Sequence, residues 1–328
     1  MNEIKIATVW TTKDFKQTVI FTLLKTLSKK KITIVEPKNA DLIIYGAFNW
    51  DEKLFHLYKF FLRKVKHEKL KDFIKKYQMK LINSSFFNRK YKPLTLFYNQ
   101  EPLSYNYLET DFSISTHLGI DKENHLRYFF LKDSIDWSSE GFFRKENTVA
   151  KLFGRYIQLK ELLIPQGENF LKKDRKICIF SSHMQEPRRI IFETFSKFFE
   201  VSGFGAAFNK SIKNSDSSVD KKIDTFNNFA FNFCLENSII PGHSSARVAD
   251  AFVGKCLPIT YAHQSINYDY NLNAFINLND HFHDNFRSII YNLQDDNFLR
   301  KFTKEPLLLK TLTLDKEIKF IQKILNYF

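Results

Sequence analysis

The stretch from Phe231 to Tyr261 reads FNFCLENSIIPGHSSARVADAFVGKCLPITY, and its pattern is that of a strand, a loop, a helix and a second strand. An apolar run ends at Leu235, polar residues follow, and Pro241-Gly242 turns the chain into a helix that Gly254 ends. Short apolar strands that alternate with helices indicate a parallel sheet. Ligands of such sheets bind beyond the carboxyl ends of the strands, so the polar loop after Leu235 is the first place to expect a site.

The same alternation continues through both halves of the chain. We expect strands at residues 5–11, 32–36, 42–45, 93–98, 112–115, 176–181, 201–205, 229–235 and 257–261. We expect helices at residues 13–28, 60–74, 139–163, 187–199 and 245–253. Proline, glycine and charge gather at Pro165–Asp174, which marks a domain boundary.

The sequence therefore predicts an α/β fold of two Rossmann-like domains, residues 1–165 and 166–304. Residues 305–328 carry apolar side chains at helical spacing and are expected to form a C-terminal helix. Two positions for this helix remain open at this stage: against the first domain, or at a membrane surface.

Composition excludes several classes of protein. The chain has 328 residues, of which 44% are hydrophobic and 26% charged, a globular rather than disordered or collagen-like balance. The three cysteines, Cys178, Cys234 and Cys256, lie in apolar sequence without metal-ligand spacing, and we interpret them as reduced core residues. His281 and His283 lack the further ligands that a zinc site requires.

The net charge of +14 is concentrated in one lysine-rich segment, residues 59–80. Two interpretations stay open: the solvated face of a helix, or a surface that attracts anionic lipid or lipopolysaccharide. Nucleic acid is not expected as a partner, because no helix-turn-helix, zinc-finger or base-stacking motif accompanies the charge.

No targeting or membrane-spanning segment is predicted. Lys5 and Lys13 interrupt the first apolar segments, and the run from Thr18 to Leu27 contains Lys25 and is shorter than the roughly 20 residues that cross a bilayer. The expected location is cytoplasmic, with peripheral association at the inner face of the cytoplasmic membrane as the alternative.

The residues after Leu235 resemble the donor-binding block of glycosyltransferase family 10, the α-1,3/4-fucosyltransferases. The matching groups are Glu236-Asn237-Ser238, Pro241-Gly242, Arg247, Asp250-Ala251-Phe252, Cys256, Pro258-Ile259, Phe275-Ile276-Asn277 and Asp280. Pro187-Arg188-Arg189 is similar to the family's arginine-bearing helix. Asn99-Gln100-Glu101-Pro102 and Asp111-Phe112-Ser113-Ile114 resemble its acceptor-side block.

This resemblance implies the GT-B architecture, with two Rossmann-like domains facing a central cleft, the acceptor in the first domain and the donor in the second. It implies transfer of fucose from GDP-fucose to a glycan or lipopolysaccharide acceptor with inversion, without a cofactor. Glu101 aligns with the family's general base, and Arg188 with the arginine that contacts the donor diphosphate. The chain contains no aspartate-x-aspartate motif, which favours a metal-free mechanism with Arg188, Arg247 and N–H groups near Gly242 and Ser244 as the stabilising groups.

The expected donor-binding residues are Arg188, Glu236, Asn237, His243, Ser244, Ser245 and Arg247. Simpler roles stay open for three of the candidates: a strand-end surface residue for Glu101, a turn former for Asn237, and a surface loop histidine for His243. Glu236 has two candidate roles, to orient a donor hydroxyl or to pair with Arg247.

The match departs from the family where the donor binds. Ser245-Ala246-Arg247 stands where the family has threonine-glutamate-lysine, and His243 replaces a tyrosine. The family's glutamate holds the donor ribose, which Ala246 cannot do, and arginine differs from lysine in geometry. Two alternatives therefore accompany the fucosyltransferase hypothesis: the same fold with another nucleotide-sugar donor, and a non-catalytic basic module that binds anionic polymer or membrane.

Overall fold

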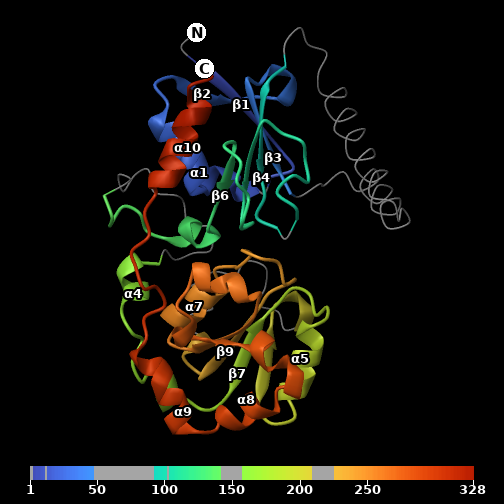
Figure 1. The fold of residues 1–328 in the computed structure, drawn as a ribbon, viewed down its shortest axis with the longest axis vertical. Helices are drawn as coiled ribbons and strands as arrows, with labels where there is room; N and C mark the ends of the chain where they lie inside the picture. The colour runs from blue at the N-terminus through green and yellow to red at the C-terminus, as the bar shows by residue number, and fades with distance from the viewer. Residues whose placement is uncertain (1–2, 12, 48–91, 102, 142–156, 209–224) are drawn as a thin grey trace, which may run out of the picture. The chain divides into compact units, whose positions relative to one another are not determined.

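The computed structural model describes residues 3–11, 13–47, 92–101, 103–141, 157–208 and 225–328. The chain divides into two compact units (Figure 1). The first unit consists of Met1–Tyr128 together with Leu314–Phe328, and the second of Phe129–Thr313.

The first unit is built on a parallel sheet. Its described strands are β1 (Glu3–Val9), β2 (Lys31–Ile34), β3 (Leu42–Gly46), β4 (Leu94–Tyr98), β5 (Phe112–Ser115) and β6 (His125–Arg127), in the order β2-β1-β3-β4-β5-β6. Every residue of β3 is buried, as expected for a strand covered on both faces. The strands expected from the sequence are present, and β6 is an addition to them.

Helices α1 (Val19–Leu27) and α10 (Asp315–Leu325) lie against each other in this unit (Figure 1). The hydroxyl of Thr18 caps α1 by accepting a hydrogen bond from the N–H of Phe21 at 3.3 Å. Residues 13–28 therefore form a 3₁₀ turn followed by a shorter helix, where a continuous helix was expected.

The second unit repeats the same strand arrangement. Its strands are β7 (Ile177–Phe180), β8 (Val201–Phe204), β9 (Phe231–Leu235), β10 (Leu257–Tyr261) and β11 (Ile276–Asn277), all parallel, in the order β11-β10-β9-β7-β8. The chain first runs outward from β7 to β8 and then returns to the other side of β7 at β9. The strand order therefore reverses between β7 and β9, which is the topological switch point where doubly wound folds bind ligands.

Short helices accompany these strands. The described α-helices of the second unit are α4 (Leu159–Leu163), α5 (Arg188–Phe195), α7 (Arg247–Val253), α8 (Arg287–Asn292) and α9 (Asp296–Arg300). The described 3₁₀ segments are η1 (Lys13–Gln17), η2 (Pro37–Asn39), η3 (Phe130–Ser134), η5 (Phe170–Lys172), η6 (Ala206–Phe208), η8 (Gln264–Tyr268), η9 (Leu272–Ala274), η10 (Leu278–Asp284) and η11 (Lys301–Lys304). Gly254 is the C-cap of α7, as the sequence predicts.

The boundary between the units differs from the expected one. It lies at Tyr128/Phe129, whereas the proline and glycine near residue 165 placed it at 165/166. The Pro165–Asp174 stretch is a connection inside the second unit, because the N–H of Gly167 donates to the carbonyl of Thr303 at 3.2 Å. Leu308 N–H likewise donates to Leu162 O at 2.8 Å.

The C-terminal segment is also divided differently. The expected helix over 305–328 is helical only at Asp315–Leu325, because Leu307 and Leu308 are buried in the second unit and the chain reaches the first unit at Leu314. Of the two positions left open for this helix, the structure shows packing on the first unit, where the rings of Phe112 and Phe320 meet edge to face at 5.7 Å.

Two expectations lie outside the described residues. These are the helix of the lysine-rich segment and most of the helical passage at 139–163. In the part of the chain that is described, no helix has the length and apolar character needed to cross a membrane.

Candidate active site

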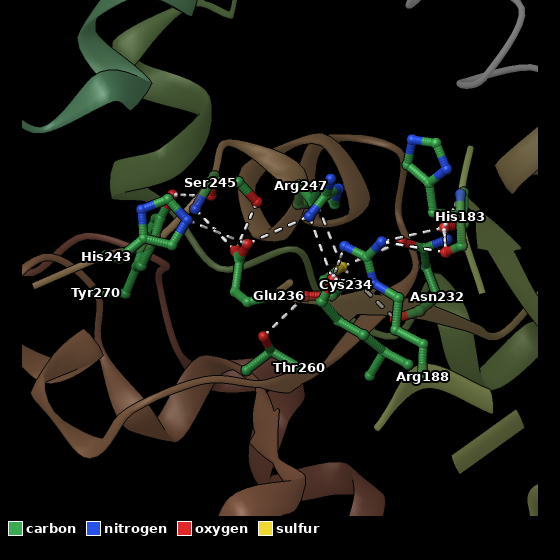
Figure 2. Close-up of polar contacts among 12 residues, drawn as sticks. His183, Arg188, Asn232, Cys234, Glu236, His243, Ser245, Arg247, Thr260 and Tyr270 are labelled. Atoms are coloured by element: carbon green, nitrogen blue, oxygen red, sulfur yellow. Dashed lines mark hydrogen bonds and ion pairs between the residues drawn. The ribbon is translucent and has the colours of Figure 1, made fainter. Parts of the chain in front are cut away.

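Arg188 joins the two strand ends at the switch point of the second unit (Figure 2). It is the first residue of α5, directly after the loop that follows β7. Its Nε and Nη2 atoms donate to the carbonyl oxygen of Leu235, at the end of β9, at 3.2 and 2.8 Å. Its Nη1 atom donates to Ser181 Oγ at 3.2 Å and to the carbonyl oxygen of His183 at 3.3 Å, both beyond the end of β7.

Arg188 is a buried cation, with 6% of its surface exposed. Burial lowers the pKa of its guanidinium group to about 10; the positive charge of Arg247 acts in the same direction, and Glu236 opposes both. Arg188 therefore remains charged at neutral pH. Arg189, the next residue, is exposed and pairs with Glu186 at 2.6 Å, so the two neighbouring arginines lie in opposite environments.

Glu236 supplies the negative charge of the site. Its carboxylate is 2% exposed and lies directly after β9. Oε1 accepts from the N–H of Ser245 at 2.8 Å and from Ser245 Oγ at 2.6 Å, whereas Oε2 lies 3.2 Å from Nη1 of Arg247 (Figure 2). The structure thus shows the ion pair with Arg247, one of the two roles considered for this residue.

The carbonyl oxygen of Leu235 brings the two arginines together. It accepts from Arg188 and also from Nη1 of Arg247, at 3.2 Å. Arg247 begins α7, and 37% of its side chain is exposed. Two guanidinium groups therefore meet at this oxygen, and Glu236 pairs with Arg247: Arg188 is enclosed by protein acceptors, and Arg247 is partly open to solvent.

The loop between β9 and α7 is held by a second set of contacts. Gly242 has a φ of +84°, which favours glycine, and its N–H donates to Ser265 Oγ at 2.7 Å. The N–H of Gly242, expected to face the donor, is thus engaged within the protein. Ser244 is buried, with its Oγ 3.5 Å from Asp269 Oδ2.

Tyr270 closes the inner side of this loop. Its hydroxyl donates to the carbonyl oxygen of Ser245 at 3.3 Å, and its ring meets that of Phe129 edge to face at 5.1 Å. Burial raises the pKa of the Tyr270 hydroxyl well above its usual range, so it acts as a neutral donor at physiological pH. Ser245 is thereby held from both sides, by Glu236 and by Tyr270.

Two polar atoms of the loop are buried without a hydrogen-bond partner among the described residues: His243 Nδ1 and Ser238 Oγ. The His243 side chain is 9% exposed, and its Nε2 lies 3.9 Å from Oε2 of Glu236. His243 is therefore more enclosed than the surface histidine considered as an alternative. Asn237, by contrast, is exposed.

Glu101 belongs to the first unit, beyond the carboxyl end of β4. Its N–H donates to Asn99 Oδ1 at 3.0 Å, and Asn99 Nδ2 donates to the carbonyl oxygen of Leu103 at 2.7 Å. Asn99 is fully buried, so these bonds fix the turn that carries Glu101. The other candidate residues all belong to the second unit.

The three cysteines are free and buried, as the sequence predicts. Burial raises the pKa of the Cys178 and Cys234 thiols well above their usual range, which keeps them protonated. Within the described ranges, no group of three or more His, Cys, Asp or Glu side chains is arranged to hold a metal ion.

Sequence reasoning missed several residues that build the site. Ser181 was assigned only to a strand end, yet it bonds Arg188, and the rule that ligands bind at switch points would have drawn attention to it. Ser265 and Tyr270 carry no signal in the sequence, because their contacts with the loop depend on how distant segments pack.

The chain matches a family model by sequence and several solved structures by fold. Residues 170–302 match the family model described as "Glycosyltransferase family 10 (fucosyltransferase) C-term". A crystal structure of an alpha1,3-fucosyltransferase superposes with a TM-score of 0.65 at 21% sequence identity, over 99% of this chain and 90% of that one. A structure of an alpha1,3-fucosyltransferase with GDP-fucose gives a TM-score of 0.64 at 19% identity, over 99% and 91% of the two chains. No curated protein matches the chain significantly by sequence.

The fold expectation is thus confirmed as the α/β architecture of GT-B enzymes, with one parallel sheet in each unit. The family model covers β7 to α9 and hence the loop that holds Glu236 and Arg247. The segment from residue 170 to residue 302 thus matches the model of the C-terminal domain of glycosyltransferase family 10, the fucosyltransferases.

Proposed function

We propose that the protein transfers fucose from GDP-fucose to a hydroxyl of a glycan, with inversion at the sugar carbon. One arrangement carries this proposal. Arg188 and Arg247 both donate to the carbonyl oxygen of Leu235, and Arg247 also pairs with Glu236, at the switch point of the segment that matches family 10. A structural relative is described with GDP-fucose and another with GDP, which supports this donor.

The charges suit a diphosphate leaving group. Arg188 and Arg247 carry two positive charges, and Glu236 neutralises one of them. Fixed guanidinium groups at this place attract the diphosphate and stabilise the negative charge that grows on it as the sugar departs. Because Arg247 is the more exposed arginine, we assign it direct contact with the diphosphate. We assign Arg188 the role of holding the start of the loop through its hydrogen bonds to the carbonyl oxygen of Leu235.

Asn237, His243, Ser244 and Ser245 complete the proposed donor site. His243 Nδ1 and Ser238 Oγ are buried with hydrogen-bonding capacity that no described protein group uses, and a polar ligand would satisfy them. Asn237 is exposed at the start of the same loop, where it can reach a sugar hydroxyl.

The reaction requires a base for the attacking hydroxyl. As the acceptor oxygen bonds to the anomeric carbon, the bond from that carbon to the diphosphate oxygen breaks, and the acceptor proton passes to a carboxylate. We assign this role to Glu101, on the turn beyond β4. We further propose a glycan of lipopolysaccharide as the acceptor class and a cytoplasmic location with peripheral membrane association, on the basis of the basic charge of the chain.

Calorimetry with GDP-fucose tests the donor. We expect the wild-type chain to bind GDP-fucose, and so should Arg189→Ala, the control at an exposed position. Arg247→Ala should raise the Kd about tenfold or more, because it removes one charge-assisted contact. Glu101→Gln should keep GDP-fucose affinity and lose about 10²-fold or more in the rate of GDP release with acceptor. Absence of binding by GDP-fucose and GDP would contradict the donor assignment.

One observation favours a second candidate, a different nucleotide-sugar donor. Ala246 offers no carboxylate for the ribose, and the buried Nδ1 of His243 provides a hydrogen-bonding group where the family has tyrosine. Thermal shift against a panel of guanosine, uridine and cytidine diphosphate sugars separates the candidates: the largest shift with a donor other than GDP-fucose selects the second.

A further inference from the structure

A cavity of about 460 Å³ lies beside β11, the edge strand of the second sheet. This volume is within the range of small-molecule sites, about 300 to 1,000 Å³. Strand β10 separates β11 from β9, and none of the residues assigned to donor binding, from Arg188 to Arg247, lines this cavity. Four residues that do line it, Phe275, Ile276, Asn277 and Asp280, belong to the stretch that resembles the family's donor-binding block. The cavity is therefore a different place in the unit.

The floor of the cavity is apolar. Phe275 and Phe302 are buried, at 2% and 4% exposure, and Ile276 and Ile289 are buried beside them. Leu272 lines the cavity as well and is 47% exposed, so it marks the open side.

A cation lies over the aromatic part of the lining. Nζ of Lys301 is 3.8 Å from the ring centroid of Phe298 and 4.9 Å from that of Phe302. Among the described residues, no carboxylate lies within ion-pair distance of this ammonium group. The ammonium group therefore lies over two aromatic rings and forms no salt bridge among the described residues.

Carboxylates supply the acceptors. Glu305 is held by a hydrogen bond from Nδ2 of the buried Asn271 to Oε2, at 3.0 Å. Asp280 lines the cavity from an exposed position. His281 lines the cavity too, and burial lowers the pKa of its imidazole, which favours the neutral form. Two carboxylates, one ammonium group and a neutral imidazole therefore surround an apolar floor.

This combination selects a class of ligand. A phosphate or another polyanion meets two like charges for each opposite one, and a purely apolar ligand would strip water from charged groups without replacing their hydrogen bonds. A sugar ring has an apolar C–H face for the floor and hydroxyls that both donate to carboxylates and accept from an ammonium group. We infer that the cavity beside β11 binds an uncharged saccharide, independently of the donor site.

Saturation-transfer NMR on the full chain tests this with lactose, N-acetyllactosamine and maltotriose as neutral probes and sialyllactose as the anionic one, each in the presence and absence of GDP. The variants are Lys301→Ala, Asp280→Ala and Leu272→Trp, which fills the open side. Lys304→Ala is the matched control, because Lys304 is exposed, three residues from Lys301, and does not line the cavity.

The expected result is a saturation-transfer signal for at least one neutral saccharide, which binds with a Kd on the order of millimolar. GDP should leave this signal unchanged, Leu272→Trp should abolish it, and Lys301→Ala and Asp280→Ala should weaken it about tenfold, while Lys304→Ala retains it. The inference is overturned by silence of all neutral probes, by a signal that GDP removes or Leu272→Trp preserves, or by stronger binding of the anionic probe. Calorimetry with GDP-fucose reports on the donor site separately, so the two proposals fail independently.

Discussion

The side chain of Arg188 holds the carbonyl oxygen of Leu235 with two hydrogen bonds, at 3.2 Å from Nε and 2.8 Å from Nη2. Because Nη1 of the same guanidinium group donates to Ser181 Oγ and to the carbonyl of His183, one side chain fixes the ends of both strands at the switch point. Arg188 therefore has a structural role in addition to the charge that it would contribute to the proposed donor site.

Replacement of Arg188 by lysine tests this role. A lysine ammonium lacks the planar fork that reaches both strand ends, so buried acceptors lose their donors. We expect the free energy of unfolding to fall by about 2 to 4 kcal/mol in urea titrations. Arg189→Lys is the matched control on the exposed side of the same helix, with a change of about 0.5 kcal/mol or less. Equal effects of the two substitutions would contradict the assignment.

Glu236→Gln tests the charge balance of the site. The amide can still accept from Ser245, but it no longer compensates the positive charges of Arg188 and Arg247. We expect a loss of about 2 to 3 kcal/mol in the free energy of unfolding, and a larger loss for Glu236→Ala, which also leaves the N–H of Ser245 without its acceptor. Glu193→Gln, on an exposed position of α5, is the control. A Glu236→Gln protein as stable as this control would show that the buried ion pair is dispensable.

His125 should make stability depend on pH. Burial, followed by the charges of His117 and Lys122, lowers the pKa of its imidazole from about 6.5 to about 4. Nδ1 is 2.8 Å from Ser113 Oγ, and Nε2 is buried without a partner among the described residues. Between pH 4 and 6.5 the unfolded state binds a proton that the folded state does not, so stability falls as the pH falls through this window.

The loss attributable to His125 is about 1 to 2 kcal/mol, after discounting for the partial exposure of the ring. Urea titrations at pH 7 and pH 4.5 measure it, and His125→Gln should reduce the difference between the two pH values by that amount. His183→Gln, at an exposed position, should leave it unchanged. The same pH dependence in His125→Gln as in the wild type would assign the effect to other groups.

The sequence predicted the sheets well because short apolar strands and glycine stops are local signals. The strand at 112–115 and the strand at 257–261 appear at the expected residues, and the loop after Leu235 is indeed at a switch point. β11 was not expected, since a strand of two residues has no periodicity to detect.

The contacts of the site were less accessible to sequence reasoning. That Arg188 bonds backbone carbonyls follows from how β7 and β9 end side by side, which no local pattern encodes. The helix predicted over residues 305–328 was too long for a similar reason. The apolar residues of this segment follow one helical pattern, but Leu307 and Leu308 are buried in the second unit, and Ile321 and Ile324 in the first. Periodicity reports that a residue is buried and does not report against what.

The assignment of α10 to the first unit can be tested at Phe320. Its ring is 7% exposed and packs edge to face on Phe112 of β5, so Phe320→Ala leaves a cavity and should cost about 3 to 5 kcal/mol. Native-state hydrogen exchange locates the effect: amides of β5 and α1 should exchange faster, whereas those of β9 and β10 keep their protection. Lys319→Ala, exposed on the same helix, should change neither set. Loss of protection in β9 rather than β5 would place the C-terminal helix with the second unit.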